Sequence, residues 1–369
     1  GRSQPVEGAE AILNGIAPDG GLFVPEIIPV LDKNIFAAMG EWNYQQKAVY
    51  ILKQYLAEFS DEEIDYCVYG AYNPNNFDND SIAPLIKLND SLYVLELWHG
   101  PTSAFKDMAL QVLPRLLTTS ARKQGDMSEF VVLVATSGDT GKAALEGFKD
   151  VEGTRIIVFY PREGVSQVQE RQMVTQEGKN VNVVAVNGNF DDAQTGVKRI
   201  FASSDMINLL AEQNRKMSSA NSINWGRLLP QIVYYISAYV ELRRNGKVPE
   251  GESINFVVPT GNFGNILAAY YAGRMGVPIN KLICASNANN VLTEFINTGV
   301  YDRQRKFEKT ISPSMDILIS SNLERLLFEL TGHDDVRISQ WMRELQQNGY
   351  YEVDKQTLNQ VQELFTKLF

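Results

Sequence analysis

Two strand-turn-helix units constrain the fold of this chain more than any other feature of its sequence. The first consists of the apolar run Phe130 to Ala135 and the glycine-bearing turn Thr136 to Gly141, followed by a helical pattern. The second consists of the run Ile254 to Pro259, the turn Thr260 to Asn265 and a helical pattern from Ile266 to Arg274. Such units build parallel sheets covered by helices, so the sequence predicts an α/β protein with doubly wound, mostly parallel sheets.

Further apolar runs extend this pattern. Strands are predicted at 155–160, 181–186 and 282–285, and the stretches between them are long enough for helical crossovers. Apolar side chains recur at helical spacing from Asn43 to Phe59, and an apolar helix is predicted from Met108 to Leu117. Helices and strands should therefore alternate along most of the chain.

Changes in this pattern predict three parts. Residues 1–85 are expected to form a helical N-terminal subdomain and residues 121–214 a smaller α/β domain. Residues 86–120 and 215–369 together are expected to form a large domain. Linker-like segments near the borders suggest that the two glycine turns sit in different halves.

The composition excludes several classes of function. A net charge of −10 disfavours nucleic acid or an anionic membrane as a partner, because both require a basic surface. Cys67 and Cys284 have no metal-ligand spacing, which favours a reducing compartment, and with no secretion signal the cytoplasm is expected. The sequence has no run of eighteen apolar residues, so no membrane span is predicted. With two histidines and no GxSxG motif, no metal site and no conventional hydrolase is expected.

The second glycine turn has the features of an anion site. Backbone N–H groups at the start of a helix attract an anion, and glycine allows its close approach. An ordinary tight turn would have the same sequence. Dinucleotide and P-loop motifs do not fit, since Thr136 and Ala143 replace the glycine and hydroxyl that a P-loop needs in the first turn. The second turn suits a single phosphate monoester, such as that of pyridoxal phosphate.

Lys106 lies among small and aromatic residues, just before the predicted helix from Met108. Burial there would favour the neutral amine that imine formation requires, although many lysines at helix starts are solvated. The first glycine turn, from Ser137 to Gly141, offers hydroxyls and backbone donors that suit a substrate carboxylate, or it is a plain turn.

Taken together, these motifs resemble threonine synthase, a family of fold-type II pyridoxal-phosphate enzymes. The resemblance extends over nearly the whole chain and rests on six segments, at 18–25, 99–107, 135–141, 221–225, 259–265 and 310–316.

The resemblance implies a set of cofactor contacts. Lys106 would carry pyridoxal phosphate as an imine, and Thr310 would lie near the pyridine nitrogen, where a hydroxyl would not hold a full pyridinium. Asp139 matches the loop that contacts the ring oxygen. The cofactor phosphate would be cradled by Gly261, Asn262, Phe263, Gly264 and Asn265.

The resemblance also implies a substrate, O-phospho-L-homoserine, which family members convert with water into L-threonine and phosphate. Lys106 would move protons at Cα and Cβ. The expected substrate-binding residues are Thr136, Ser137, Gly138, Thr140, Asn221, Ser222, Asn224, Arg227 and Arg162. Either arginine could instead be a solvated surface charge.

Several alternatives stay open at this point. A serine or threonine dehydratase or a β-replacement enzyme would share the lysine and both glycine turns. A non-catalytic relative that binds the cofactor is a second possibility, and a nucleotide-dependent oxidoreductase is disfavoured by the missing motifs. The expected partner is a small molecule, and the protein is expected to be a monomer or homodimer. Family members usually continue beyond the amphipathic helix expected at Phe369, which leaves the activity of this chain open.

Overall fold

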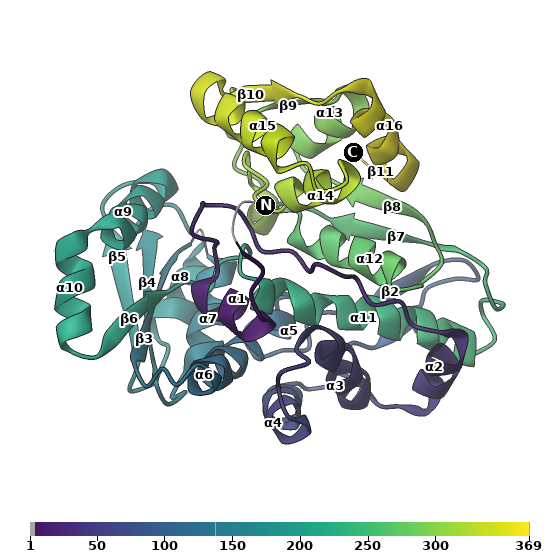
Figure 1. The fold of residues 1–369 in the computed structure, drawn as a ribbon, viewed down its shortest axis with the longest axis horizontal. Coiled ribbons are helices and arrows are strands. Elements are labelled where there is room, and N and C mark those ends of the chain that lie inside the picture. Colours follow the sequence, from purple (N-terminus) through teal and green to yellow (C-terminus); the bar gives the residue numbers. More distant parts are fainter. Residues whose placement is uncertain (1–3, 137, 369) are drawn as a thin grey trace. The chain divides into compact units, whose positions relative to one another are not determined.

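The computed structural model describes residues 4–136 and 138–368, whose helices and strands are labelled in Figure 1. The chain divides into two compact units. Unit 1 contains residues 4–5, 16–40 and 239–368, and unit 2 contains residues 6–15, 41–136 and 138–238. Lys106 and the first glycine turn belong to unit 2, whereas the second glycine turn belongs to unit 1. The predicted domain borders stay a prediction.

Unit 2 consists of helices and strands in alternation. In chain order its elements are α1 (Gly8–Asn14), α3 (Tyr44–Tyr55), α4 (Asp61–Ala71), β1 (Leu85–Lys87), β2 (Tyr93–Leu95), α5 (Asp107–Leu110), α6 (Leu113–Lys123), β3 (Glu129–Ala135), α7 (Asp139–Phe148), β4 (Thr154–Pro161), α8 (Gln167–Val174), β5 (Val181–Val186), α9 (Phe190–Ala202), α10 (Ser204–Glu212), β6 (Arg215–Ser218) and α11 (Trp225–Arg244), whose last residues extend into unit 1.

Unit 1 has a second, smaller set of strands and helices. Its elements are α2 (Lys33–Ala38), the 3-10 helix η1 (Met39–Glu41) at its border, β7 (Ile254–Pro259), α12 (Gly264–Arg274), β8 (Ile279–Ala285), α13 (Val291–Thr298), β9 (Val300–Asp302), the 3-10 helix η2 (Pro313–Met315), α14 (Leu323–Leu330), α15 (Asp335–Asn348), β10 (Tyr350–Glu352), α16 (Lys355–Leu364) and β11 (Phe365–Leu368).

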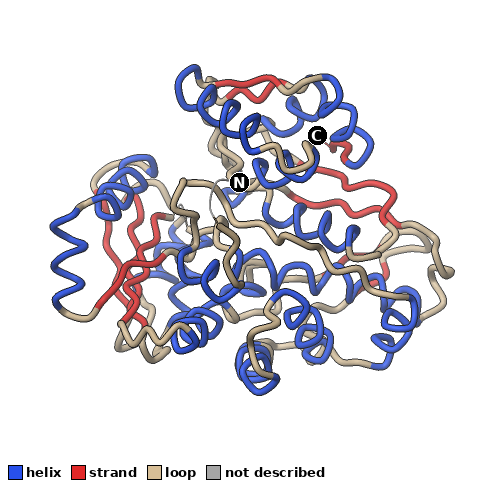
Figure 2. Tube along the Cα trace, in the orientation of Figure 1, coloured by secondary structure: helices blue, strands red, loops and turns tan. Residues whose placement is uncertain are grey.

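The main sheet of unit 2 is parallel and covered on both faces, as Figure 2 shows for its red strands among blue helices. Side chains alternate between the faces of a strand, so Val131 and Leu133 of β3 pack with Val197 of α9. On the other face, α7 passes so close that a Cβ at Gly141 would lie 2.8 Å from the side chain of Val158. The doubly wound α/β fold predicted from the sequence is confirmed.

The strand order of this sheet, β5-β4-β3-β6, creates a topological switch point. The chain proceeds from β3 to β4 and β5 in one direction, and then returns to place β6 on the opposite side of β3. In open α/β sheets, ligands bind beyond the carboxyl ends of the strands at such a point. Here those ends lead into the loops after Ala135 and Ser218.

Unit 1 contains a parallel sheet of order β11-β8-β7 and an antiparallel pair, β9 and β10. The expectation that the chain ends in a helix at Phe369 is wrong for the described residues, because α16 stops at Leu364 and β11 follows. The buried ring of Phe365 begins this strand and packs on Phe263, with the ring centroids 5.5 Å apart. Burial in the sheet therefore overrides the helical pattern.

The predicted helix from Met108 to Leu117 is also wrong in one respect, since it is broken between α5 and α6. Pro114 has no N–H to donate to the carbonyl of Leu110, and its ring excludes a continuous helix there. The Leu110 carbonyl instead approaches α7 so closely that a Cβ at Gly147 would lie 2.0 Å from its oxygen.

Other predicted elements are confirmed. The strands at 181–186 and 254–259 have the expected bounds, and α3 begins after Asn43, whose side chain forms a capping box with Gln46. Among the described residues, no helix is long and apolar enough to cross a membrane.

Candidate functional site

The loop before α5 holds Lys106 in a fixed position in unit 2. The buried carboxylate of Asp107 accepts hydrogen bonds from the Thr102 backbone N–H at 2.8 Å and from its hydroxyl at 2.7 Å. A Cβ at Gly100 would lie 2.5 Å from the Cβ of Asp107, so only glycine allows the loop to close this tightly. The HGPT-x-AFKD stretch therefore forms a compact turn that ends at Lys106.

The amine of Lys106 is buried beside other charged groups. Burial lowers its pKa to about 8, and the positive charges of Arg227 and Lys142 add to this effect, while Asp139 opposes it. Its Nζ lies 3.8 Å from Oδ2 of Asp139. A larger fraction of this amine is neutral near physiological pH than for an exposed lysine, as imine formation requires.

The loop after β3 is held by Thr136. Its buried hydroxyl accepts hydrogen bonds from the N–H groups of Gly138, at 2.9 Å, and Gly141, at 3.0 Å. Gly138 has φ 139°, and a Cβ there would overlap the side chain of Gln169. Thr136 was expected to contact the substrate, but its geometry favours a role in shaping the loop. Ser137, another expected substrate contact, lies outside the described residues.

The next two residues begin α7. The carboxylate of Asp139 is oriented by Gln169, whose Nε2 donates to Oδ1 at 2.7 Å. Lys142 lies one turn later, with its Nζ 3.6 Å from the same oxygen. Thr140 is half-buried at this helix start, which faces the switch point.

The loop after β6 follows the carboxyl end of the strand that pairs with β3. Asn221 and Ser222 are half-buried there, and the buried guanidinium of Arg227 donates to the Ala220 carbonyl at 2.7 Å. Burial lowers the pKa of Arg227 to about 10. Arg162 follows β4 and is exposed.

The side chain of Asn224, an expected substrate contact, is held inside the protein. Its fully buried amide donates to the Ile12 carbonyl at 2.9 Å and accepts from the Gly226 N–H at 2.8 Å. Both ends of the side chain are therefore used inside the protein. Asn224 anchors α1 to the start of α11, a role at odds with a direct substrate contact.

The second glycine turn forms a cup in unit 1, between β7 and α12. The carbonyl groups of this turn accept hydrogen bonds from residues further along the chain. Ser320 Oγ donates to the Gly261 carbonyl, and the backbone N–H and Nδ2 of Asn322 each donate to the Asn262 carbonyl at 3.1 Å. Among the described residues, the N–H groups of Gly261, Asn262 and Phe263 have no hydrogen-bond acceptor.

Backbone conformation completes the cup. Phe263 has φ 65°, which is strained for a bulky residue, and its ring is buried. A left-handed residue before a helix turns successive N–H groups toward one point, which creates an anion-binding concavity. Gly264 and Asn265 form the first turn of α12, at the positive end of its dipole.

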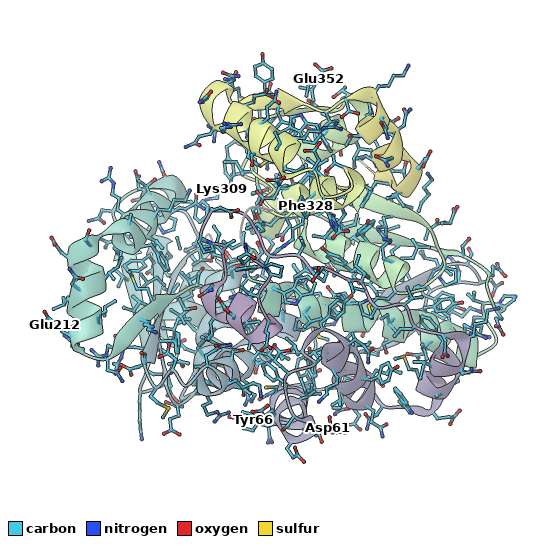
Figure 3. All side chains as sticks on the ribbon, viewed as in Figure 1. Asp61, Tyr66, Glu212, Lys309, Phe328 and Glu352 are labelled. Carbon is cyan, nitrogen blue, oxygen red and sulfur yellow. The ribbon has the colours of Figure 1, made fainter. Side chains whose placement is uncertain are left out.

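A polar cluster surrounds Thr310 in unit 1, directly after the exposed Lys309 that Figure 3 labels. Asp316 accepts hydrogen bonds from Asn287 at 2.7 Å and Asn289 at 3.0 Å, and from the hydroxyl of Thr310. Asn287 also donates to the Thr310 hydroxyl oxygen at 3.0 Å. The Thr310 hydroxyl is therefore held in place by neighbours on both sides of it.

Asn287 and Asn289 lie just after β8, at the same edge of the sheet as the cup after β7. The cup and the segment after Thr310 pack closely at Gly261, because a Cβ there would lie 3.2 Å from the Ser314 carbonyl oxygen. Sequence reasoning missed both asparagines, although their place after a predicted strand was a usable signal. It also missed Lys142 as a member of the site in unit 2.

Each of these groups, taken by itself, suits one part of pyridoxal phosphate. The cup in unit 1 offers N–H donors without acceptors to a phosphate, and unit 2 offers a buried amine to a carbonyl carbon. Among the described residues, no group of three or more His, Cys, Asp or Glu side chains is arranged to hold a metal ion.

Comparisons with known proteins agree with this chemistry. Residues 1–72 match the family model described as threonine synthase N terminus, and residues 79–357 match the model described as pyridoxal-phosphate dependent enzyme. The crystal structure of pyridoxal-phosphate-bound threonine synthase from Brucella melitensis is similar, with a TM-score of 0.92 and 37% identity, over 100% of this chain and 76% of that chain.

Two curated relatives are similar over nearly the whole chain. Threonine synthase-like 1 of Homo sapiens is 41% identical over 97% of this chain, which spans only 49% of that relative's length. Threonine synthase of Pseudomonas aeruginosa is 38% identical over 100% of this chain and 76% of its own length. The expected cofactor and fold type are thereby confirmed, and the chain belongs to the family of pyridoxal-phosphate dependent enzymes, in its threonine synthase branch.

Proposed function

We propose that this protein is a threonine synthase, which converts O-phospho-L-homoserine and water into L-threonine and phosphate. The observation that carries the proposal is the buried amine of Lys106, whose pKa is lowered to about 8, in a chain of this family. The similarity to threonine synthases of 38% identity supports the reaction, while the equally similar threonine synthase-like 1 proteins make its direct measurement necessary.

Cofactor binding is assigned to the residues that the resemblance implies. Lys106 would hold the carbonyl carbon of pyridoxal phosphate, and the N–H groups of Gly261 to Asn265 would hold its phosphate. Thr310 would serve the pyridine nitrogen and Asp139 the ring oxygen. When bound, the cofactor acts as an electron sink for the carbon from which a proton is removed.

Lys106 also moves protons. Released from the cofactor, its neutral amine takes a proton from Cα of the substrate and then one from Cβ. The bond between Cγ and the phosphate oxygen then breaks, and a proton equivalent to the one taken from Cβ is delivered to Cγ. Water adds its hydroxyl at Cβ and gives its other proton to the released phosphate, and Cα takes back a proton from Lys106. A pKa near 8 suits this alternation, because both the amine and the ammonium are then accessible at neutral pH.

Charge near Lys106 favours an anionic substrate. The positive charges of Arg227 and Lys142 both act on the amine of Lys106, and the negative charge of Asp139 opposes them. We assign the substrate phosphate to Arg227, Asn221 and Ser222, with Arg162 as an outer contact.

The substrate carboxylate is assigned to the N-terminus of α7, at Gly138 and Thr140. Backbone N–H groups at this position and the positive end of the helix dipole both favour a carboxylate. The proposal includes a small-molecule substrate as the partner, a cytoplasmic location and a monomer or homodimer.

One experiment tests the reaction. Incubation with O-phospho-L-homoserine should release phosphate and L-threonine in equal amounts, and Lys106→Ala should abolish both. Borohydride reduction followed by peptide mapping should place the cofactor on Lys106. Release of 2-oxobutyrate from threonine, without turnover of phosphohomoserine, would instead identify a dehydratase, and no turnover of either would indicate a non-catalytic relative.

A further inference from the structure

Lys142 is a second buried lysine close to Lys106 in unit 2. Its side chain is 10% exposed, and its Nζ donates to the Thr102 carbonyl at 2.9 Å. The same Nζ lies 3.6 Å from Oδ1 of Asp139. Lys142 therefore contacts both the loop that carries Lys106 and the carboxylate beside it.

Asp139 lies at similar distances from the two amines. Its Oδ1 is 3.6 Å from Lys142 and accepts from Gln169, and its Oδ2 is 3.8 Å from Lys106, so the carboxylate is an ion-pair partner of both amines and is hydrogen-bonded to neither. Lys142 also has the Thr102 carbonyl as an acceptor. Among the described residues, Lys142 therefore has a hydrogen-bond acceptor in addition to the shared carboxylate, whereas Lys106 has the shared carboxylate alone.

The balance of charge points the same way. Lys106 interacts with the basic Lys142 and Arg227 and with the acidic Asp139, and Asp107 in turn interacts with Lys142. With both amines protonated, the cluster has one positive charge too many, and an uncompensated buried charge is unfavourable. Loss of one proton removes the excess, and in the part of the chain that the structure describes Lys106 is the amine with fewer acceptors.

We propose that Lys142 is a positioning residue that keeps Lys106 in its neutral form, because it adds a positive charge and shares Asp139, so that this carboxylate is not a full counterion to Lys106. The inference rests on the proposed role of Lys106 as the amine that binds the cofactor. In this proposal, a residue of α7 controls the protonation of Lys106, which lies in the loop before α5.

The test measures how fast pyridoxal phosphate reacts with Lys106 as the pH changes. Full-length protein freed of cofactor is mixed with pyridoxal phosphate between about pH 6 and 10, reduced with borohydride, and analysed by peptide mass spectrometry. The initial rate should rise with a midpoint of about 8 in the unaltered protein.

Two substitutions separate charge from shape. Lys142→Gln removes the charge but keeps a donor for Thr102, and its midpoint should rise by about one pH unit, which makes trapping about tenfold slower at neutral pH. Lys142→Arg keeps the charge and should keep the midpoint. Lys216→Met, which removes an exposed lysine paired with Asp126 at 2.6 Å, is the matched control.

The outcomes are distinct. A purely structural role for Lys142 would lower the plateau at high pH without moving the midpoint, and that result would overturn the inference. Label on a lysine other than Lys106 in the unaltered protein would instead overturn the proposed function.

Asp139→Asn decides the question if Lys142→Gln does not fold. If Lys142 shares the Asp139 carboxylate with Lys106, loss of that carboxylate should lower the midpoint pH of the Lys106 trapping rate by less than about one pH unit. A larger drop would mean that Asp139 serves Lys106 alone, contrary to the inference.

Discussion

The hydroxyl of Thr310 donates a hydrogen bond to the carboxylate of Asp316, with 2.7 Å between Oγ1 and Oδ1. The Thr310 backbone N–H donates to the other carboxylate oxygen at 2.9 Å. Asn287 and Asn289 donate to Oδ1 as well, so four hydrogen bonds converge on one side chain. Asp316 therefore determines where the Thr310 hydroxyl points.

Asp316→Asn should disorganise this cluster. An amide places a donor where the carboxylate accepts, and loss of a hydrogen bond to a charged group costs about 1.5–3 kcal/mol. We expect lower stability in urea unfolding and weaker binding of pyridoxal phosphate. Asp90→Asn, which alters a fully exposed aspartate, is the control. Unchanged cofactor affinity in Asp316→Asn would separate this cluster from the cofactor site.

Gly261→Ala tests the cup. The added Cβ would lie 3.1 Å from Ile317 Cδ1 and 3.2 Å from the Ser314 carbonyl oxygen, and the backbone atom cannot move aside easily. We expect the turn to shift and the affinity for pyridoxal phosphate, measured by absorbance titration, to fall at least about tenfold, a loss near 1.4 kcal/mol.

Gly196→Ala is the control for this substitution. Gly196 lies within α9, and a Cβ there would meet no atom within 4 Å. It should stabilise the protein by about 0.5–1 kcal/mol and leave cofactor affinity unchanged, because alanine favours a helix over glycine. Equal cofactor affinity in both variants would contradict the assignment of the cup.

His99 should stabilise unit 2 in a pH-dependent way. Its ring lies between Asp78, 2.6 Å from Nδ1, and Glu96, 2.8 Å from Nε2. Burial of the ring lowers its pKa, but the hydrogen bonds with Glu96 and Asp78 outweigh this effect and raise the pKa overall. A raised pKa means that the folded state binds the proton more tightly than the unfolded state does.

The stabilisation should therefore be complete below the unfolded-state pKa of about 6.5 and be lost as the pH rises through the higher folded-state value. In urea unfolding, His99→Gln should lose more stability at acidic than at alkaline pH. Asp80→Asn, an exposed aspartate nearby, controls for altered surface charge. An equal loss at both pH values would show that the imidazolium contributes nothing beyond packing.

The sequence predicts well what depends on neighbouring residues. The strands β5 and β7 and the turns after β3 and β7 follow from local apolar runs and glycines. In contrast, β6 has the sequence Arg-Lys-Met-Ser and becomes a strand only because β3 pairs with it. Its existence depends on tertiary structure that no local pattern expresses.

The site follows the same rule. Lys106 and the cup were identified by motif, but the contact of Lys142 with Thr102 joins residues 40 positions apart. The amides of Asn287 and Asn289 likewise acquire their partners only when β8 brings them to the Thr310 segment. Asn224 shows the opposite case, since a residue in a predicted substrate-binding motif is a buried anchor.

Asn224 and Asn221 should respond differently to substitution. Asn224→Ala leaves the Ile12 carbonyl and the Gly226 N–H without partners in a buried place, and each such loss costs about 1–3 kcal/mol. We expect a large fall in the free energy of unfolding in urea. Asn221→Ala, at a half-buried loop position, should change stability little and raise KM for O-phospho-L-homoserine instead. If Asn224→Ala unfolds like the unaltered protein yet raises KM, the side chain binds substrate and its anchoring role is wrong.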